Sequence, residues 1–125
     1  MEEEQFKDRE LKFRVWNPDE EQMMHFTLNN IWFPDRYLIQ DKYDVQQYTG
    51  LKDWTGKEIY EGDILARLNT EYFYEVRYDV EGTCYLVTNK DGQGNLGYYR
   101  KLIEVIGNIF ETPDLLNKHS LRIRQ

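Results

Sequence analysis

Short segments in which hydrophobic and polar positions alternate make up much of this chain. Residues 11–16 and 72–79 alternate one by one, which predicts strands with one buried face. Residues 83–88 follow the second segment after a Val-Glu-Gly turn, so we expect these two segments to pair as an antiparallel hairpin. Further short strands are predicted at residues 23–28, 45–48, 63–68 and 103–110. Gly107 interrupts the last of these, and we expect a bulge or a close backbone approach there.

Three glycines six residues apart mark the segment 47–65. Gly50, Gly56 and Gly62 lie among turn-forming or charged residues, and glycine adopts positive φ without strain. The segment therefore predicts tight turns that define the fold and lead into a strand beginning near Asp63. We interpret the Asp63 side chain as a turn cap rather than a general base. The segment holds no nucleophile–base pair, no metal-ligand spacing and no phosphate loop.

The end of the chain predicts a loop and then a helix. Residues 89–97 contain three glycines, two asparagines and an aspartate, which indicates a flexible loop. Thr112-Pro113-Asp114 predicts a short C-terminal helix with Thr112 as its N-cap. Strands with turn signals every 8 to 12 residues predict a mainly β fold with an antiparallel, barrel-like core, SH3-like or related, and a few extra loops or strands. We expect a charged N-terminal arm at residues 1–10 and a single β-rich domain at 11–125.

Composition and charge narrow the classes of function. The chain has 125 residues, ten of them tyrosines, and tyrosine suits half-buried strand faces that are used for assembly. A net charge of −7 argues against non-specific binding of nucleic acid or of an anionic membrane surface. Cys84 is the only cysteine, so an intrachain disulfide and a cysteine-based zinc site are excluded, and we expect a small buried side chain. No apolar run approaches the ~20 residues that span a bilayer.

Three pieces of the sequence resemble the YopX family, whose members are small proteins of phages and prophages. Residues 48–65, Y-T-G-L-K-D-W-T-G-K-E-I-Y-E-G-D-I-L, resemble the family signature. Residues 11–17, L-K-F-R-V-W-N, resemble its opening strand, where an aspartate often replaces Asn17, and residues 103–116, I-E-V-I-G-N-I-F-E-T-P-D-L-L, resemble its closing strand and helix. The resemblance implies a mostly β, oligomeric protein encoded by a mobile element. It implies no biochemical activity.

No catalytic group of residues, metal site or cofactor site emerges from the sequence. His25 and His119 are the only histidines and nothing places them together, while the acidic run at 19–21 is best interpreted as a solvated turn. We therefore expect a non-enzymatic, homo-oligomeric β module that acts through contacts with itself or with a host or phage protein in the bacterial cytoplasm. The alternative is a small β-barrel that binds single-stranded nucleic acid.

Two features are candidates for contact residues. The run Tyr98-Tyr99-Arg100-Lys101 combines rings on which bases stack with cations that meet phosphates, as in proteins that bind single strands. The other interpretation of this run is strand packing or a subunit contact. Trp54, in a turn, either covers the end of the barrel or reaches a neighbouring subunit.

Overall fold

The computed structural model describes residues 10–27 and 42–116. It divides into two compact units, Met1–Gly50 and Leu51–Gln125, and each is described by itself below. His119 and all of the predicted N-terminal arm except Glu10 lie outside the described residues. The expectation of one domain from 11 to 125 stays a prediction.

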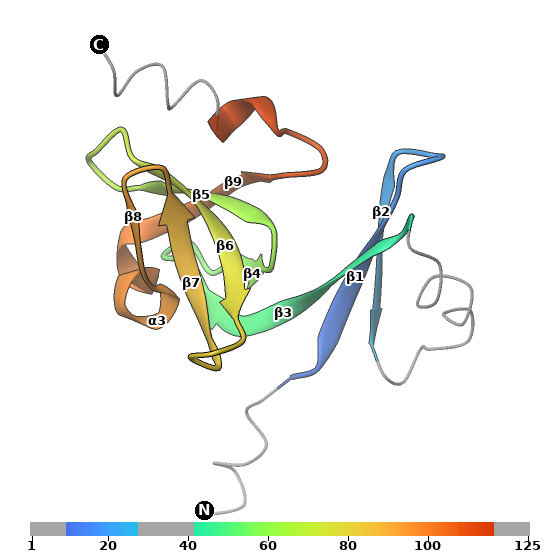
Figure 1. Ribbon diagram of the computed structural model, residues 1–125, viewed down its shortest axis with the longest axis horizontal. Coiled ribbons are helices and arrows are strands. Elements are labelled where there is room, and N and C mark those ends of the chain that lie inside the picture. Colours follow the sequence, from blue (N-terminus) through green and yellow to red (C-terminus); the bar gives the residue numbers. More distant parts are fainter. Residues whose placement is uncertain (1–9, 28–41, 117–125) are drawn as a thin grey trace, which may run out of the picture. The chain divides into compact units, whose positions relative to one another are not determined.

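The first unit is a twisted antiparallel ribbon of strands β1 (Lys12–Asn17), β2 (Gln22–Thr27) and most of β3 (Asp44–Lys52) (Figure 1). In this ribbon β1 lies between β2 and β3 and pairs antiparallel with both. The strand predicted at the start of the chain is confirmed, because β1 pairs with β2 over its whole length. Its burial does not alternate as predicted, since Arg14 is buried beside Val15 and Leu11 is exposed. The strand predicted at 45–48 is longer than expected and extends through Gly50.

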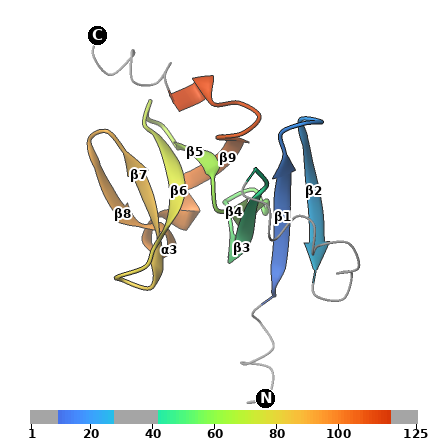
Figure 2. The same ribbon diagram turned by 45° about the vertical axis from the view of Figure 1, so that its right-hand side comes forward.

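The second unit contains a five-stranded antiparallel sheet with the strand order β8-β7-β6-β5-β9 (Figure 2). Its elements are β4 (Glu58–Tyr60), β5 (Asp63–Arg67), β6 (Phe73–Asp79), β7 (Cys84–Asn89), β8 (Gly92–Asn95), the short helix α3 (Leu96–Tyr99), the 3-10 turn η2 (Arg100–Leu102) and β9 (Ile103–Asn108). The chain is helical again at residues 114–116, as predicted.

The core of this unit is formed by seven buried apolar side chains. Every element from β4 to β9 except β8 and η2 contributes to it: Ile59, Leu65, Val76, Val87, Leu96, Ile103 and Val105. Tyr74 packs against this cluster from the same face of β6 as Val76, as the alternation predicted. The protein is therefore mainly β with a barrel-like antiparallel core, in agreement with the predicted fold class.

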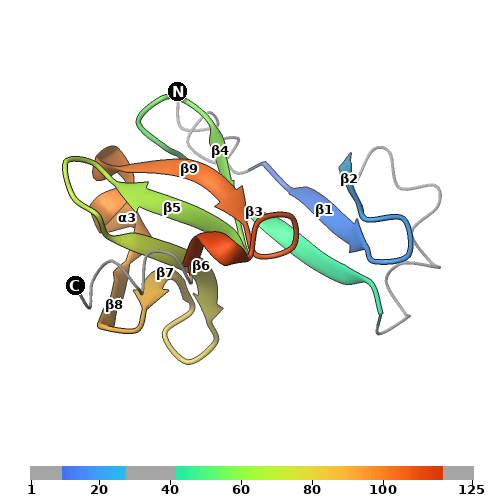
Figure 3. The ribbon, with the colours of Figure 1, turned by 90° about the horizontal axis from the view of Figure 1, so that it is seen from above.

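Strands β5 and β9 lie side by side (Figure 3). Their pairing contains the bulge predicted at Gly107. Ile64 lies opposite Gly107 and Leu65 opposite Val105, so β9 has one extra residue at this point. A Cβ on Gly107 would collide with the Thr112 hydroxyl, which explains the need for glycine. That hydroxyl accepts a hydrogen bond from the Asn108 N–H (3.0 Å) and donates one to the Asn108 carbonyl (3.1 Å). Thr112 thus closes a turn behind β9. The prediction that its side chain caps the C-terminal helix is wrong.

The prediction of a flexible loop at residues 89–97 is wrong, because the chain forms strand β8 and the start of helix α3 there. Asn89 accepts a hydrogen bond from the Asp91 N–H (2.9 Å), which closes a tight turn, and β8 then pairs with β7. The Asn95 side chain accepts from the Gly97 N–H (2.9 Å) and starts α3, whose Leu96 is fully buried. Glycines that indicated a loop instead form an edge strand, because the backbone pairing and the burial of Leu96 outweigh low strand propensity.

Candidate functional site

The turn that carries Trp54 is held by the carboxylate of Asp53, which is 5% exposed. One carboxylate oxygen accepts hydrogen bonds from the Thr55 N–H (2.9 Å), the Thr55 hydroxyl (2.7 Å) and the Lys57 N–H (2.9 Å). The other accepts from the Val105 N–H in β9 (2.8 Å). A single side chain therefore closes the turn and fastens it to the sheet of the second unit.

These hydrogen bonds also decide the charge state of Asp53. Burial by itself raises the pKa of the Asp53 carboxyl, but the donors from Val105, Thr55 and Lys57 lower it by more, so the net pKa is below its usual value. The carboxylate is therefore ionised in neutral solution. Because it accepts these four hydrogen bonds from the protein itself, it is suited to fixing the backbone and not to proton transfer.

The three spaced glycines and Asp63 are all placed at backbone positions with special requirements. Gly50, Gly56 and Gly62 have φ of 88°, 95° and 84°, in the left-handed region that favours glycine. Gly50 lies within β3 and not in a turn, whereas the other two lie in turns. Asp63 is 2% exposed and accepts a hydrogen bond from the Tyr60 N–H (2.7 Å), the geometry expected of a turn cap.

The run from Tyr98 to Lys101 does not lie in a strand, because it spans the end of α3 and the start of η2. Tyr98 is 86% exposed, the largest exposed fraction among the exposed large hydrophobic residues of the described chain. Tyr99 turns the other way, with its ring stacked on that of Tyr74 at 6.4 Å between centroids. The two tyrosines therefore do not form one continuous stacking surface.

Trp54, Tyr98 and Leu102 are exposed apolar residues of this unit, and we call the three the aromatic edge. They are 57%, 86% and 44% exposed. The backbone N–H of Trp54 donates a hydrogen bond to the Ile103 carbonyl (3.3 Å). Ile103 directly follows Leu102, so the Trp54 turn borders the end of η2. Arg100 and Lys101 of the same turn supply the only basic side chains in η2. More than half of Trp54 is exposed, and its two interpretations, a cover for the end of the barrel or a contact with a neighbouring subunit, stay predictions.

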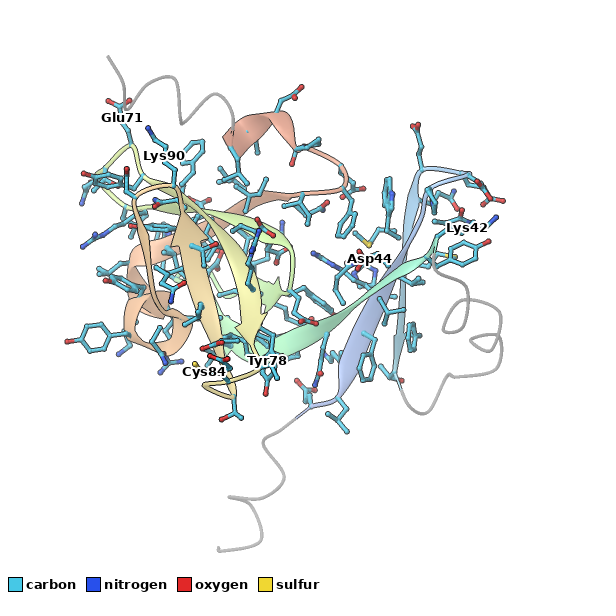
Figure 4. The ribbon with its side chains drawn as sticks, viewed as in Figure 1. Lys42, Asp44, Glu71, Tyr78, Cys84 and Lys90 are labelled. Atoms are coloured by element: carbon cyan, nitrogen blue, oxygen red, sulfur yellow. The ribbon has the colours of Figure 1, made fainter. Side chains whose placement is uncertain are left out.

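A second feature is an open hollow of about 370 Å³ in the second unit, which we call the tyrosine hollow. It lies beside the turns after β5 and after β7, and Figure 4 shows Glu71 and Lys90 of these turns at the same end of the unit. Its lining combines aromatic, charged and amide side chains with glycine backbone: Arg67, Tyr72, Tyr74, Val87, Asn89, Asp91, Gly92, Gln93, Gly94 and Tyr99. The Arg67 guanidinium lies 5.5 Å from the centroid of the Tyr99 ring.

Glycine in β8 makes room for the ring at the base of this hollow. A Cβ on Gly94 would approach Cε2 of Tyr99 to 2.5 Å, so any larger residue there would displace the ring. The other side of the β6–β8 hairpins carries a larger hollow of about 760 Å³. That hollow is lined mainly by charged and polar side chains of mixed sign and lacks a stack of rings: Glu75, Arg77, Tyr78, Asp79, Leu86, Thr88, Asn89, Lys90, Asp91, Gly92, Gln93 and Leu116.

Other candidate chemistry is not brought together in the part of the chain that the structure describes. Among those residues, no three His, Cys, Asp or Glu side chains are grouped so as to hold a metal ion. His25 is exposed on β2, and the acidic run at 19–21 forms the β1–β2 turn. Cys84 is half-buried, and not fully buried as expected. None of the helices among residues 10–27 and 42–116 is both long and apolar enough to cross a membrane.

Comparison with known proteins now identifies the family. The family model described as YopX protein matches residues 34–117, about two-thirds of the sequence. The chain belongs to the YopX family. The fold agrees with the crystal structure of protein EF1440 from Enterococcus faecalis, with a TM-score of 0.57 and 28% identity over 85% of this chain and 97% of that one. It also agrees with the structure of protein yopX from Bacillus subtilis, with a TM-score of 0.52 and 20% identity over 86% and 97%.

No curated protein matches this YopX-family sequence. The comparisons therefore establish family and fold, as the resemblance of residues 11–17, 48–65 and 103–116 predicted. Sequence reasoning found Trp54 and Tyr98 but missed the tyrosine hollow. The alternation in β6 placed Tyr72 and Tyr74 on one face, and that was the only available signal, because Arg67, Asp91 and Tyr99 reach the hollow from other elements.

Proposed function

We propose that this YopX-family protein, encoded by a phage or prophage, is a non-enzymatic β module that acts through protein–protein contacts in the bacterial cytoplasm. The partner that we propose is a second copy of the same chain, and the other candidate is a host or phage protein. The observation that carries the proposal is the aromatic edge, in which Trp54, Tyr98 and Leu102 expose 57%, 86% and 44% of their surface.

Exposed tryptophan and tyrosine are the residue types that most often dominate the binding energy of an interface. The Asp53 carboxylate holds the Trp54 turn through four hydrogen bonds, and Asn95 starts the helix that carries Tyr98. Such fixed backbone lowers the entropy that is lost when a partner binds. The edge therefore combines large apolar contact area with a preorganised framework.

Nucleic-acid binding by the 98–101 run is the alternative, and the geometry supports it less well. Only Tyr98 of the two tyrosines is strongly exposed, because Tyr99 packs on Tyr74. The net charge of −7 opposes association with a polyanion, since binding of this kind depends on neutralised phosphates. We expect no binding of single-stranded DNA through Arg100 and Lys101 at physiological salt.

Light scattering across a concentration and salt series tests the proposal. We expect wild type to form a stable closed oligomer whose mass falls in Trp54→Ala. Val80→Ala is the matched control, because Val80 is 76% exposed in the β6–β7 turn, away from the edge, and should leave the mass unchanged. A wild-type monomer at every concentration contradicts self-association, and a mass that does not change in Trp54→Ala contradicts the role of the edge.

A further inference from the structure

The Arg67 guanidinium in the tyrosine hollow has no polar partner among the residues that the structure describes. Within residues 10–27 and 42–116 it forms a cation–π contact with Tyr99 and neither a hydrogen bond nor an ion pair. Arginine presents five donors in a planar fork that matches phosphate or carboxylate oxygens. A guanidinium that lies against a ring, with its donors unused by the protein, is suited to an anionic group of a ligand.

The rings beside Arg67 provide a surface for a planar group. Tyr74 and Tyr99 are stacked at 6.4 Å with an interplanar angle of 25°, and Tyr72 is a third ring in the lining. Every nucleobase stacks on aromatic side chains, which contributes about 1–3 kcal/mol per base. Gly92 at the start of β8 has open space where a side chain would lie, so a flat ligand can enter the hollow past it.

Polar groups lie on the other side of the hollow. Asn89 uses its amide to hold the turn, because its NH₂ donates to the Phe73 carbonyl (3.1 Å) and its oxygen accepts from the Asp91 N–H (2.9 Å). The side chains of Asp91 and Gln93 form no hydrogen bond or ion pair within the described chain, and Asp91 does not pair with Arg67 although both line the hollow. They are therefore available to accept from ribose hydroxyls or to pair with the edge of a base.

These three observations favour one class of ligand. A quaternary ammonium ion also binds among aromatic rings, but Arg67 places a positive charge in this hollow and opposes it. An apolar ligand would leave Arg67 and Asp91 desolvated without partners. The volume of about 370 Å³ lies in the range of small-molecule sites, roughly 300–1,000 Å³.

We propose that the tyrosine hollow binds a nucleoside monophosphate group, with the phosphate on Arg67, the base on the Tyr74–Tyr99 stack, and the ribose or base edge at Asp91 and Gln93. The group is either a free nucleotide or one nucleotide of a single strand. This site shares none of Trp54, Tyr98 and Leu102, so it stands independently of the proposed assembly function.

Isothermal titration calorimetry on the full chain tests the site. The ligands are AMP, GMP, CMP and UMP, the corresponding nucleosides, and a mixed eight-nucleotide single strand. We expect at least one monophosphate to bind more tightly than its nucleoside. Arg67→Met should weaken that monophosphate about tenfold or more, because charge-assisted hydrogen bonds to phosphate are lost. Arg77→Met is the matched control, since Arg77 belongs to the larger hollow and should leave the affinity unchanged.

Tyr99→Leu tests the stack, and we expect it to weaken monophosphate and nucleoside alike by about fivefold or more. Melting curves confirm that each variant is folded, and Arg67→Met, at a partly exposed position, keeps the test valid if Tyr99→Leu does not fold. Tighter binding of the single strand in competition with the monophosphate identifies a strand as the source, and binding of the monophosphate alone identifies a free nucleotide.

Three results would overturn the proposal. The first is no binding of any monophosphate at millimolar concentration. The second is an affinity that Arg67→Met leaves unchanged while Arg77→Met lowers it, which would place the ligand in the larger hollow. The third is tetramethylammonium binding more tightly than every monophosphate, which would make the hollow a cation site. Light scattering on the same samples reports the assembly function separately, so failure of one proposal does not imply failure of the other.

Discussion

The Asp53 turn and the tyrosine hollow belong to the same unit but use their polar groups in opposite ways. In the turn, both carboxylate oxygens accept hydrogen bonds from the protein itself, including one from a residue 52 positions away in the sequence. In the hollow, Arg67, Asp91 and Gln93 have side chains that find no hydrogen-bonding partner within the described chain. Trp54 sits in the first region, yet most of its side chain faces outward.

The contrast separates residues that build the fold from residues that remain available for binding. A buried carboxylate whose two oxygens both accept hydrogen bonds from the protein stabilises one conformation. A guanidinium against a ring contributes little to the backbone and keeps its donors. Substitutions of Asp53 should therefore act on stability, whereas substitutions of Arg67 in the hollow or of the exposed side chains of the aromatic edge should act on binding.

The largest expected effect is that of Asp53→Asn. The amide retains one acceptor oxygen but places an NH₂ where a donor now points at the carboxylate, so a buried N–H such as that of Val105 loses its partner. We expect the free energy of unfolding to fall by about 3 kcal/mol, since each hydrogen bond to a charged group contributes roughly 1.5–3 kcal/mol. Urea denaturation followed by tryptophan fluorescence measures it. Asp91→Asn, the same change in an exposed turn, should shift the free energy of unfolding by less than about 0.5 kcal/mol.

The loss of stability in Asp53→Asn should depend on pH. The pKa of the Asp53 carboxyl is lower in the folded protein than in the unfolded chain, so protonation favours unfolding. The stability that the charge contributes is fully present above the unfolded pKa, about 3.9, and is lost as pH falls through the lower folded pKa. The difference between the urea midpoints of wild type and Asp53→Asn should stay constant from neutral pH to about pH 5 and shrink as the pH falls through about 3.9 and below. A difference that is as large at pH ~3 as at neutral pH would contradict this account.

The spaced glycines differ from one another in a measurable way. Gly56 and Gly62 both have positive φ, but only Gly62 is crowded, because a Cβ there would lie 3.2 Å from Cε2 of Phe110. We expect Gly56→Ala to lower the free energy of unfolding by about 1 kcal/mol through backbone strain alone, and Gly62→Ala by about 2 kcal/mol. Thermal melting of the two variants compares them directly. Equal losses would show that packing on Phe110 adds nothing.

Local patterns predicted much of this fold. Alternation in residues 72–79 and 83–88 identified the β6–β7 hairpin, the glycine spacing identified positive φ at Gly50, Gly56 and Gly62, and Gly107 identified the bulge in β9. Each of these signals is contained within a few neighbouring residues. Edge strand β8 was missed because its sequence, Gly-Gln-Gly-Asn, has the composition of a loop and is ordered by pairing with β7.

The candidate sites were less predictable because they depend on contacts between distant segments. Asp53 had the appearance of one of several loop carboxylates, and nothing near it in the sequence indicates its bond to Val105. The sequence does not distinguish the adjacent residues Tyr98 and Tyr99. The helix α3, which Asn95 caps, directs Tyr98 outward and places Tyr99 on Tyr74. Helix placement thus decided which of the two belongs to the aromatic edge.

The smallest expected effect concerns this adjacent pair. Tyr98 is 86% exposed and its ring touches that of Tyr99 only edge-on at 5.8 Å, so Tyr98→Ala should change the free energy of unfolding by less than about 0.5 kcal/mol. Tyr99→Ala should lower it by about 2 kcal/mol, because the ring packs against the core and fills the space above Gly94. Urea denaturation of both variants at a protein concentration where wild type is dissociated isolates the fold from assembly. A loss for Tyr98→Ala as large as that for Tyr99→Ala would mean that the outward ring stabilises the monomer. Its exposure would then no longer support a role in binding a partner.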